Sequence, residues 1–373
     1  MLADFNRDGK LDVASGTGNF LLLGNGDGTF QSPLVLGAGG PGIAVGDFNL
    51  DGKPDLAVGG ITVLLNINST THTATTTTLT SSPNPSTYGQ SVVFRALVSA
   101  QGTAGVPEGT VTFYDGATIL GTGSLNNAGQ TTLSTSALPA GPHTITASYG
   151  GNSNFAGSAS AGLTQTVNKA NTTTTISAQT PNPSVAGQAV TVSFVVKPTA
   201  PGSGAPTGNV TVSDGAGDSC TATVAAGGCS LVFPAAGAKT LKASYAGDTS
   251  FNSSASAGVT HNVTDFSISA TPGSQTIKAG QKTSYKVTLS PLNGFGGTIS
   301  LSCTALPLGS TCSFVSTSIT LTGSTGGNST ITVQTSKSTP KGTFNLTFTG
   351  QFGNGAPATG GLTHTVKVTL TVQ

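Results

Sequence analysis

A duplicated segment in the middle of this chain constrains its fold more than any other feature. The string PNPSTYGQ at residues 83–90 returns as PNPSVAGQ at 181–188, and VTFYDG at 111–116 returns as VTVSDG at 210–215. The offset stays at about 97 residues, and a fixed period of this kind indicates copies of one folding unit. The 373 residues therefore form several domains rather than one.

The composition favours strands over helices. Only 7% of the residues are charged, against about 25% in an ordinary soluble protein, and Glu108 is the single Glu. Most of the residues that support long helices are therefore scarce. Thr and Val are plentiful, and their branched Cβ atoms suit a pleated strand. We predict an all-β protein.

Short alternating stretches between turn residues predict the strands of the first copy. They lie at residues 75–80, 91–99, 109–114, 117–123, 129–135, 142–149 and 161–168. A unit of this size is typical of an immunoglobulin-type β-sandwich, which has about 100 residues. The repeated motifs, with ASYGGNSNF at 147–155 and ASYAGDTSF at 243–251, resemble bacterial immunoglobulin-like repeats of surface and secreted proteins. The resemblance implies stalk, spacer or adhesive modules, and the lack of Trp separates them from antibody domains.

The C-terminal residues keep the alternation but lack both signatures, so we expect a sandwich of a different subfamily there. The predicted organisation is a partial repeat region followed by three tandem sandwiches, at residues 1–68, 72–168, 169–264 and 265–373. The segments between these units are short, which predicts a semi-rigid, monomeric string of domains.

A second repeat occupies the start of the chain, where acidic residues gather. DFNRDGKLDVA at 4–14 returns as DFNLDGKPDLA at 47–57, and seven of the 13 acidic residues lie within residues 1–68. The spacing places side-chain oxygens at positions 1, 3, 5 and 9 of a tight loop, with a main-chain carbonyl at position 7. Hard oxygen ligands in this number are what Ca²⁺ binds in proteins.

The predicted calcium ligands follow from this spacing. They are Asp4, Asn6, Asp8, the Lys10 carbonyl and Asp12 in the first loop, and Asp47, Asn49, Asp51, the Lys53 carbonyl and Asp55 in the second. Gly9 and Gly52 stand at the sharp turn, where a positive φ is needed. The loops are not EF-hands, because position 12 is Ser15 or Val58 rather than Glu. The competing interpretation is an Asp-Gly hairpin turn with solvated carboxylates, and for Asp27 a turn is the favoured interpretation.

These loops and the strands after them, with LGNGDGTF at 23–30, resemble FG-GAP/VCBS repeats. The resemblance covers residues 1–66 and implies blades of a β-propeller with calcium-binding loops. A propeller needs four to eight blades, and fewer than two are present here. We therefore expect these residues to be the end of a larger propeller, with further sequence and a signal peptide upstream of Met1.

The cysteines form two local pairs. The favoured disulfides join Cys220 to Cys229 and Cys303 to Cys312, and each is expected to stabilise a hairpin by roughly 2–3 kcal/mol. Reduced buried thiols and a metal site are the alternatives, and zinc is disfavoured by the lack of a Cys-x-x-Cys motif. Disulfides indicate an oxidising compartment outside the cytoplasm.

No arrangement of side chains in the sequence predicts an active site. The four histidines are scattered and form no zinc motif: His72, His143, His261 and His364. Asp115 and Asp214 are expected in matching Asp-Gly turns. Tyr149 and Tyr245 are expected to pack inside, with glycan stacking as the minority interpretation. We expect no enzyme activity in this chain.

The sequence thus predicts a non-catalytic secreted or cell-surface bacterial protein with a calcium-binding region and stalk or adhesive modules. One alternative is the accessory C-terminal region of a larger secreted carbohydrate-active or proteolytic enzyme, and another is a spacer without a ligand. The expected partner is a glycan or an extracellular protein. A net charge of +1 gives no steering toward nucleic acid, and no apolar stretch is long enough to span a membrane.

Overall fold

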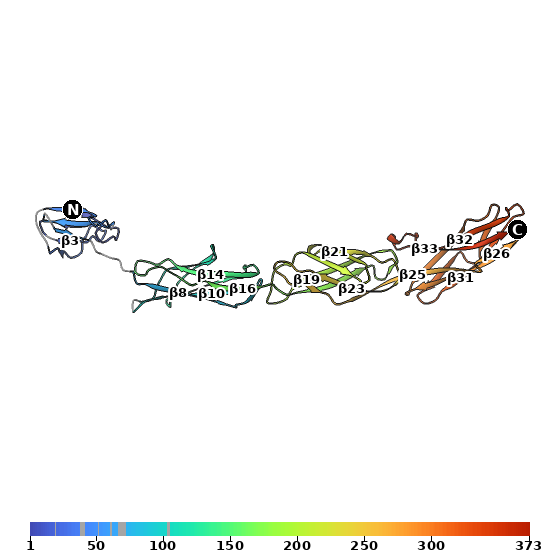
Figure 1. Cartoon of the computed structure of the whole chain (residues 1–373), viewed down its shortest axis with the longest axis horizontal. Helices are drawn as coiled ribbons and strands as arrows, with labels where there is room; N and C mark the ends of the chain where they lie inside the picture. The colour runs from blue at the N-terminus through green and yellow to red at the C-terminus, as the bar shows by residue number, and fades with distance from the viewer. Residues whose placement is uncertain (19, 38–41, 51, 60–61, 66–71, 103–104) are drawn as a thin grey trace.

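The computed structural model describes residues 1–18, 20–37, 42–50, 52–59, 62–65, 72–102 and 105–373. These residues form β-strands and no α-helix, and their only helical pieces are the 3₁₀ turns η1 (Val224–Ala226) and η2 (Pro357–Thr359). The prediction of an all-β protein is confirmed. Within this part of the chain, no helix is long and apolar enough to cross a bilayer. Figure 1 shows three sandwiches that follow one another in a row toward the C-terminus.

The N-terminal residues form two small antiparallel sheets. Strands β1 (Leu2–Ala3), β2 (Asp12–Ser15), β3 (Phe20–Leu22) and β4 (Leu34–Val35) make a four-stranded sheet in sequence order. Strands β5 (Ile43–Gly46), β6 (Asp55–Val58) and β7 (Thr62–Leu64) make a three-stranded sheet. The buried side chains of Phe5, Ala14, Leu56 and Val58 join both sheets in one small core. A four-stranded sheet is the unit of a propeller blade.

The first sandwich packs the sheet β13-β10-β8 against the sheet β12-β11-β14-β16-β9, with β15 beside β14. Its strands are β8 (Thr75–Ser82), β9 (Ser86–Thr87), β10 (Val92–Ala100), β11 (Thr110–Asp115), β12 (Thr118–Ser124), β13 (Gln130–Thr135), β14 (Gly141–Tyr149), β15 (Ser158–Ala159) and β16 (Leu163–Asn168). Every strand predicted in this copy is present, with ends within two residues of the prediction. In β10 the reason is visible, because Val92, Phe94, Ala96 and Val98 are buried and alternate with more exposed residues.

The second sandwich repeats this plan. The sheet β17-β19-β22 faces the sheet β21-β20-β23-β25, with β18 beside β25 and β24 beside β23. Its strands are β17 (Thr172–Thr180), β18 (Ser184–Val185), β19 (Ala189–Pro198), β20 (Asn209–Ser213), β21 (Ser219–Thr223), β22 (Gly228–Val232), β23 (Gly237–Tyr245), β24 (Ser254–Ala255) and β25 (Val259–Thr271). Tyr149 and Tyr245 are buried at matching positions of the two sandwiches, as predicted.

The third sandwich shares a strand with the second. Strand β25 pairs with β23 through residues 259–263 and with β27 through residues 265–271. The two sheets of the third sandwich are β25-β27-β31-β29 and β26-β33-β32-β28-β30. Its other strands are β26 (Ser274–Ile277), β27 (Lys282–Leu292), β28 (Gly296–Thr304), β29 (Thr311–Phe314), β30 (Ser318–Thr322), β31 (Gly327–Gln334), β32 (Gly342–Phe352) and β33 (Leu362–Val372). The boundary expected between residues 264 and 265 therefore falls inside one continuous strand.

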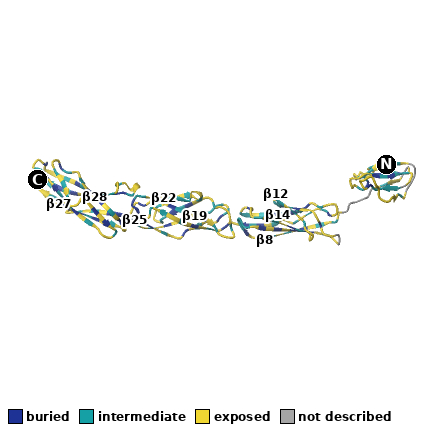
Figure 2. Ribbon diagram, turned by 180° about the vertical axis from the view of Figure 1, so that it is seen from behind, coloured by how far each residue is buried: buried dark blue, intermediate teal, exposed yellow. Residues whose placement is uncertain are grey.

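Both predicted disulfides are present, but they do not close hairpins. Cys220 and Cys229 have Cα atoms 5.9 Å apart, and those of Cys303 and Cys312 are 6.9 Å apart. Strands β21 and β22 lie in opposite sheets of the second sandwich, and β28 and β29 lie in opposite sheets of the third. The predicted hairpin is wrong because the chain crosses from one sheet to the other between the two cysteines. Each disulfide therefore ties two sheets together. Figure 2 marks buried residues in dark blue along the strands of the row.

Candidate calcium loops

The two aspartate-rich loops connect strands in the same way and share an unusual backbone. The first joins β1 to β2, and the second joins β5 to β6. Position 6 has a positive φ in both, 80° at Gly9 and 76° at Gly52, as the motif predicts. Position 4 also has a positive φ, 57° at Arg7 and 62° at Leu50, and no sequence signal indicated this. Because neither residue is a glycine, the conformation is imposed by contacts within the loop.

The aspartate at position 1 curls each loop by accepting hydrogen bonds from the turn. The Asp4 carboxylate accepts from the main-chain N–H of Asp8 (3.1 Å) and of Gly9 (2.9 Å). In the second loop Asp47 accepts from the N–H of Gly52 at 2.7 Å. Positions 3 and 5 add bonds of the same kind. The Asn6 amide oxygen also accepts from Asp8 N–H, and the Asp8 carboxylate accepts from Lys10 N–H at 2.9 Å. The side chains predicted as ligands therefore bend around a common turn.

The aspartate at position 9 closes each loop from inside the fold. Asp12 and Asp55 are completely buried, which sequence spacing alone does not predict. Asp12 accepts from Phe5 N–H at 2.8 Å with one oxygen and from Gly24 N–H at 2.8 Å with the other. Asp55 accepts from Phe48 N–H at 2.9 Å. Each carboxylate therefore has a structural role, since it ties the start of the loop to the strand that follows.

The two loops contact each other. The Arg7 guanidinium donates from Nη2 to the main-chain carbonyl of Gly52. Within the first loop, the Asn6 side-chain amide donates to Asp8 at 3.1 Å, and Lys10 Nζ lies 4.0 Å from the same carboxylate. A cationic arm thus crosses from one acidic loop to the other.

The atoms of these loops that are predicted to bind a metal ion are all oxygen atoms, and oxygen is the ligand that calcium prefers in proteins. Asn49 and Lys53 lie in the second loop, between β5 and β6, whereas Asp51 is outside the described residues. Over the part of the chain that the structure describes, no group of three or more His, Cys, Asp or Glu side chains is arranged to hold a metal ion. The acidic oxygens of the first loop instead bond to backbone amides. Among the described ligand candidates, Asp8, Asp47 and Asn49 are exposed, Asp4 and Asn6 are half-buried, and Asp12 and Asp55 are completely buried.

Asp27 occupies a separate turn, as the sequence interpretation expects. Its carboxylate accepts from the Thr29 hydroxyl at 2.6 Å and from Thr29 N–H at 2.9 Å. These two bonds, the hydroxyl first, lower the pKa of Asp27. Asp27 therefore serves as the reference for an aspartate outside the repeated loops.

In the matching Asp-Gly turns of the first two sandwiches, a histidine or a lysine lies beside the aspartate. Asp115 lies 2.7 Å from His143 Nδ1, and the other ring nitrogen faces the carbonyl of Pro139 at 2.9 Å. Asp214 lies 3.2 Å from Lys239 Nζ. Burial raises the pKa of Asp214, but bonds from Ala216 N–H and from Lys239 outweigh it, and the net shift is downward. These pairs hold turns in place and bring no nucleophile to a histidine.

Family comparison agrees with these observations. A model of the FG-GAP-like repeat matches residues 4–58, and a model of the bacterial Ig-like domain (group 3) matches residues 79–168 and 176–264. The chain carries an FG-GAP-like repeat followed by two bacterial Ig-like domains. Domains of these kinds fit a non-catalytic extracellular or surface protein. A search of curated proteins finds no match to this chain.

Several solved structures resemble parts of the Ig-like row. Domains 4 and 5 of the S-layer protein SbsC are 20% identical, with 38% of this chain and 68% of that chain covered and a TM-score of 0.21. Native E. coli alpha-2-macroglobulin is 12% identical, with 80% and 23% covered and a TM-score of 0.28. Three N-terminal domains of the bacteriophage RB49 outer capsid protein Hoc are 13% identical, with 80% and 99% covered and a TM-score of 0.25. This chain spans less than a quarter of the length of the alpha-2-macroglobulin chain.

Proposed function

We propose that this chain belongs to a secreted or cell-surface bacterial protein in which the Ig-like row is a stiff stalk. The stalk projects the calcium-binding FG-GAP region, as part of a ligand-binding head, away from the point of attachment. The observation that carries this proposal is the construction of the joints, because each sandwich contacts the next through packed side chains and main-chain bonds. A flexible tether would lack such contacts.

The joint between the first two sandwiches is built on the turn that follows the first PNPS motif. The ring of Tyr88 packs edge-on against Phe251, with centroids 5.3 Å apart. The Ser203 hydroxyl donates to the carbonyl of Gly89 at 2.8 Å, and Ser203 N–H donates to the carbonyl of Tyr88 at 3.3 Å. Gly89 has a φ of 79°, and a Cβ there would collide with Ser203. The glycine therefore permits both the turn and the close approach of the two sandwiches.

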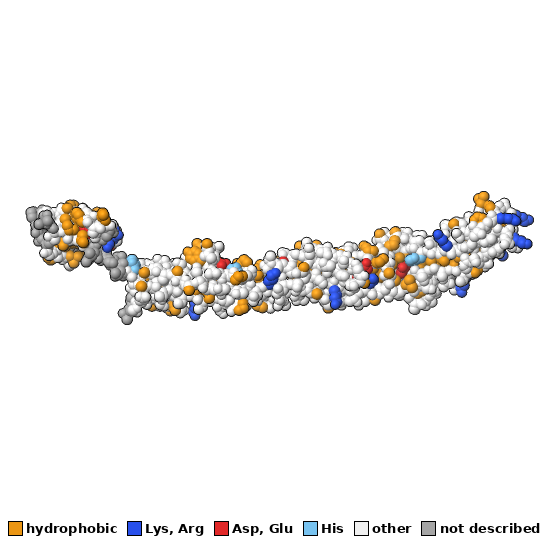
Figure 3. All heavy atoms as spheres, viewed as in Figure 1, with side chains coloured by type: hydrophobic (Ala, Val, Ile, Leu, Met, Phe, Trp, Pro, Cys, Tyr) orange, Lys and Arg blue, Asp and Glu red, His pale blue; other side chains and the backbone are white. Residues whose placement is uncertain are grey.

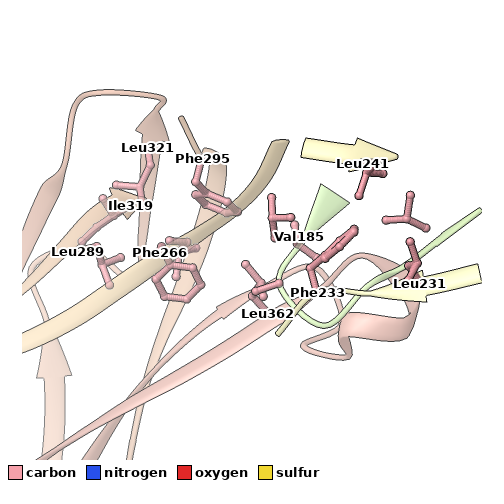
Figure 4. Packing of buried hydrophobic residues seen from close by; sticks show 14 of the residues in the cluster. Val185, Leu231, Phe233, Leu241, Phe266, Leu289, Phe295, Ile319, Leu321 and Leu362 are labelled. Carbon is pink, nitrogen blue, oxygen red and sulfur yellow. The ribbon is translucent and has the colours of Figure 1, made fainter. Parts of the chain in front are cut away.

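The joint between the second and third sandwiches uses the equivalent turn and adds a shared strand. A Cβ on Gly187, the counterpart of Gly89, would lie 3.0 Å from Pro357 of the third sandwich. Strand β25 passes through the joint without a break. Figure 4 shows Phe233 and Val185 of the second sandwich facing Leu362 of the third. Buried residues of both sandwiches belong to one hydrophobic cluster, which opposes bending at this joint.

Small-angle X-ray scattering on the full chain tests the stiffness. We expect the wild-type profile to fit one extended arrangement of the three sandwiches. Tyr88→Ala removes the ring that packs on Phe251 and should broaden the distribution of maximum dimensions. Tyr114→Ala is the matched control, since Tyr114 lies on β11 and its strand partners, Ile119 and Thr146, belong to the same sandwich. A broad distribution already present in the wild-type protein would contradict the stalk.

Calcium binding by the loops is the second part of the proposal. Asp4, Asn6, Asp8, the Lys10 carbonyl and Asp12 would hold the ion in the first loop, and Asp47, Asn49, Asp51, the Lys53 carbonyl and Asp55 in the second. A bound cation would relieve the repulsion between the carboxylates of each loop and stiffen the turn. The repeated backbone conformation at positions 4 and 6 supports two similar sites.

Isothermal titration calorimetry of the full chain with CaCl₂ tests these sites. We expect a Kd of about 10⁻⁴–10⁻³ M, the range of extracellular calcium modules. Asp8→Asn should weaken binding because it removes one ligand charge, while Asp27→Asn should leave it unchanged because Asp27 only bonds to Thr29. Equal calcium affinity of the two variants, or no heat of binding from the wild-type protein, would contradict calcium binding by the loops. Neither result would bear on the proposed stalk.

A further inference from the structure

The third sandwich carries six lysines and a single acidic side chain, Asp265, which lies 2.6 Å from His364 Nε2. Beyond Asp265 the sequence contains six Lys and no Asp, Glu or Arg. All six side chains are exposed: Lys278, Lys282, Lys286, Lys337, Lys341 and Lys367. None of them takes part in the ion pairs found among the described residues, whereas Lys239 of the second sandwich pairs with two aspartates. Within the described part of the chain, no acidic side chain therefore pairs with the lysines of the third sandwich.

Lys278, Lys282, Lys337 and Lys341 lie at the end of this sandwich farthest from the second, and we call them the lysine tip. Figure 3 shows Lys side chains gathered at the C-terminal end of the row, with no acidic side chain beside them on the face shown. The turn after Lys278 contacts the loop that contains Lys337, because a Cβ on Gly280 would lie 3.2 Å from Lys337 Cγ.

Main-chain and side-chain bonds fix these two segments together. Gly280 N–H donates to Thr335 Oγ1 at 3.0 Å, and Gln334 Nε2 donates to the carbonyl of Gly280 at 3.1 Å. Lys282 is the strand partner of Gln334. The lysines of both segments therefore project from one ordered surface rather than from separate loops.

The end of β33 brings Lys341 to the same surface. Val372 pairs with Ile277 of β26 on one side and with Gly342 of β32 on the other. Lys278 directly follows Ile277, and Lys341 directly precedes Gly342. Further along β27, Lys286 points to the same side as Lys282, about 13 Å away by the rise of a strand. The charges therefore extend from the tip along the sheet, as a ligand with repeated negative groups requires.

The residue types at the lysine tip indicate which kind of ligand with repeated negative groups it would bind. Lysine is a point charge without the planar fork with which arginine reads guanine or clamps phosphate in two bonds. The large hydrophobic residues exposed on the described part of this sandwich are Leu292, Leu308 and Val315, so no aromatic ring among them offers a base a stacking platform. We propose that the lysine tip binds an acidic polysaccharide, through several carboxylate or sulfate groups along one glycan chain.

Affinity electrophoresis of the full chain in gels containing alginate, dextran sulfate or neutral dextran tests this assignment. We expect retardation by either acidic polymer but not by neutral dextran, and a loss of retardation between low and physiological salt. Changing Lys278, Lys282, Lys337 and Lys341 together to Gln should weaken binding about tenfold or more, as four exposed charge contacts of modest energy imply. Alginate and dextran sulfate distinguish carboxylate from sulfate as the preferred group.

The matched control removes the same number of charges elsewhere, by changing Arg95, Lys197, Lys242 and Lys367 to Gln; all four are exposed. Binding by this control should stay within about twofold of the wild-type protein, since exposed charges beyond a Debye length are screened. An equal loss of binding in the tip variant and the control would mean that only net charge matters, and it would overturn the proposed site. Retention of binding by the tip variant would also overturn it, and so would stronger retardation by single-stranded or duplex DNA than by either glycan.

Discussion

At the scale of single residues, the two Ig-like domains have different polar residues at one equivalent buried position. Gln165 and His261 occupy equivalent places in β16 and β25, since each pairs with the residue that contacts the aspartate of the Asp-Gly turn, His143 or Lys239. Both are completely buried. Gln165 donates to Ser86 Oγ at 3.1 Å, and His261 Nε2 lies 2.9 Å from Ser184 Oγ. The same serine contact is therefore made once by a group that titrates and once by a group that does not.

This difference predicts a pH dependence in the second sandwich to which the equivalent position of the first sandwich does not contribute. Burial lowers the pKa of His261, so the unfolded chain binds a proton more readily than the folded one. The stability of the second sandwich should be complete above about pH 6.5, the ordinary pKa of histidine, and should fall as the pH drops below it. Thermal unfolding followed between pH 7.5 and pH 5 measures the effect.

His261→Gln is the control for that prediction, because it copies the residue that the first sandwich already uses at this position. The variant should fold, and the loss of stability at low pH should shrink. If the wild-type protein and the variant show the same pH dependence, His261 is not its source.

At the scale of strands and sheets, the disulfides have an apolar counterpart in the first sandwich. In the second sandwich, Cys220 is the strand partner of Val212, and Cys229 is the strand partner of Val192. At the equivalent positions of the first sandwich, Gly121 is the partner of Phe113, and Leu133 is the partner of Phe94. A Cβ on Gly121 would lie 2.9 Å from Leu133 Cδ1. A leucine packed over a glycine thus occupies, between the sheets of the first sandwich, the place that the disulfide takes in the second.

Loss of a disulfide should therefore weaken one sandwich and spare the first. Replacing Cys220 and Cys229 by Ser should lower the unfolding free energy of the second sandwich by roughly 2–3 kcal/mol, because the denatured chain regains the freedom of a short loop. Chemical denaturation monitored by hydrogen exchange separates the sandwiches. The first sandwich has no disulfide and provides the internal reference, and a loss of similar size there would contradict this explanation.

At the scale of the whole molecule, the two joints differ in strength. The first relies on the Tyr88–Phe251 contact and a few hydrogen bonds, whereas the second shares β25 and one hydrophobic cluster. Two sandwiches with separate hydrophobic cores can unfold separately, whereas a shared strand and a shared core couple their unfolding. The second and third sandwiches are therefore coupled more tightly to each other than to the first.

This coupling predicts shared unfolding of the last two sandwiches. Phe348→Ala removes a completely buried ring from the third sandwich and should destabilise it by about 3–5 kcal/mol. Hydrogen exchange measured by mass spectrometry should show weaker protection in the second sandwich as well. Phe94→Ala, which makes the same change in the core of the first sandwich, should leave the other two protected. Independent responses of the second and third sandwiches would contradict the coupling.

The sequence by itself determined the features that depend on residues close together in the chain. Alternation of apolar and polar residues placed each strand of the first sandwich, the aspartate spacing placed the two loops, and short separations paired the cysteines. A period of two residues and a loop of nine are local patterns, so they can be read without knowing what lies across the fold.

Only the tertiary structure decided the features that depend on how distant segments meet. These include the burial of Asp12 and Asp55, the disulfides that join opposite sheets, the strand shared by two sandwiches, and the gathering of four lysines from two segments of the chain. Each is set by contacts between residues far apart in the chain. The duplicated segment fixed how many similar units would form, whereas the packing of one unit against the next fixed how they are joined.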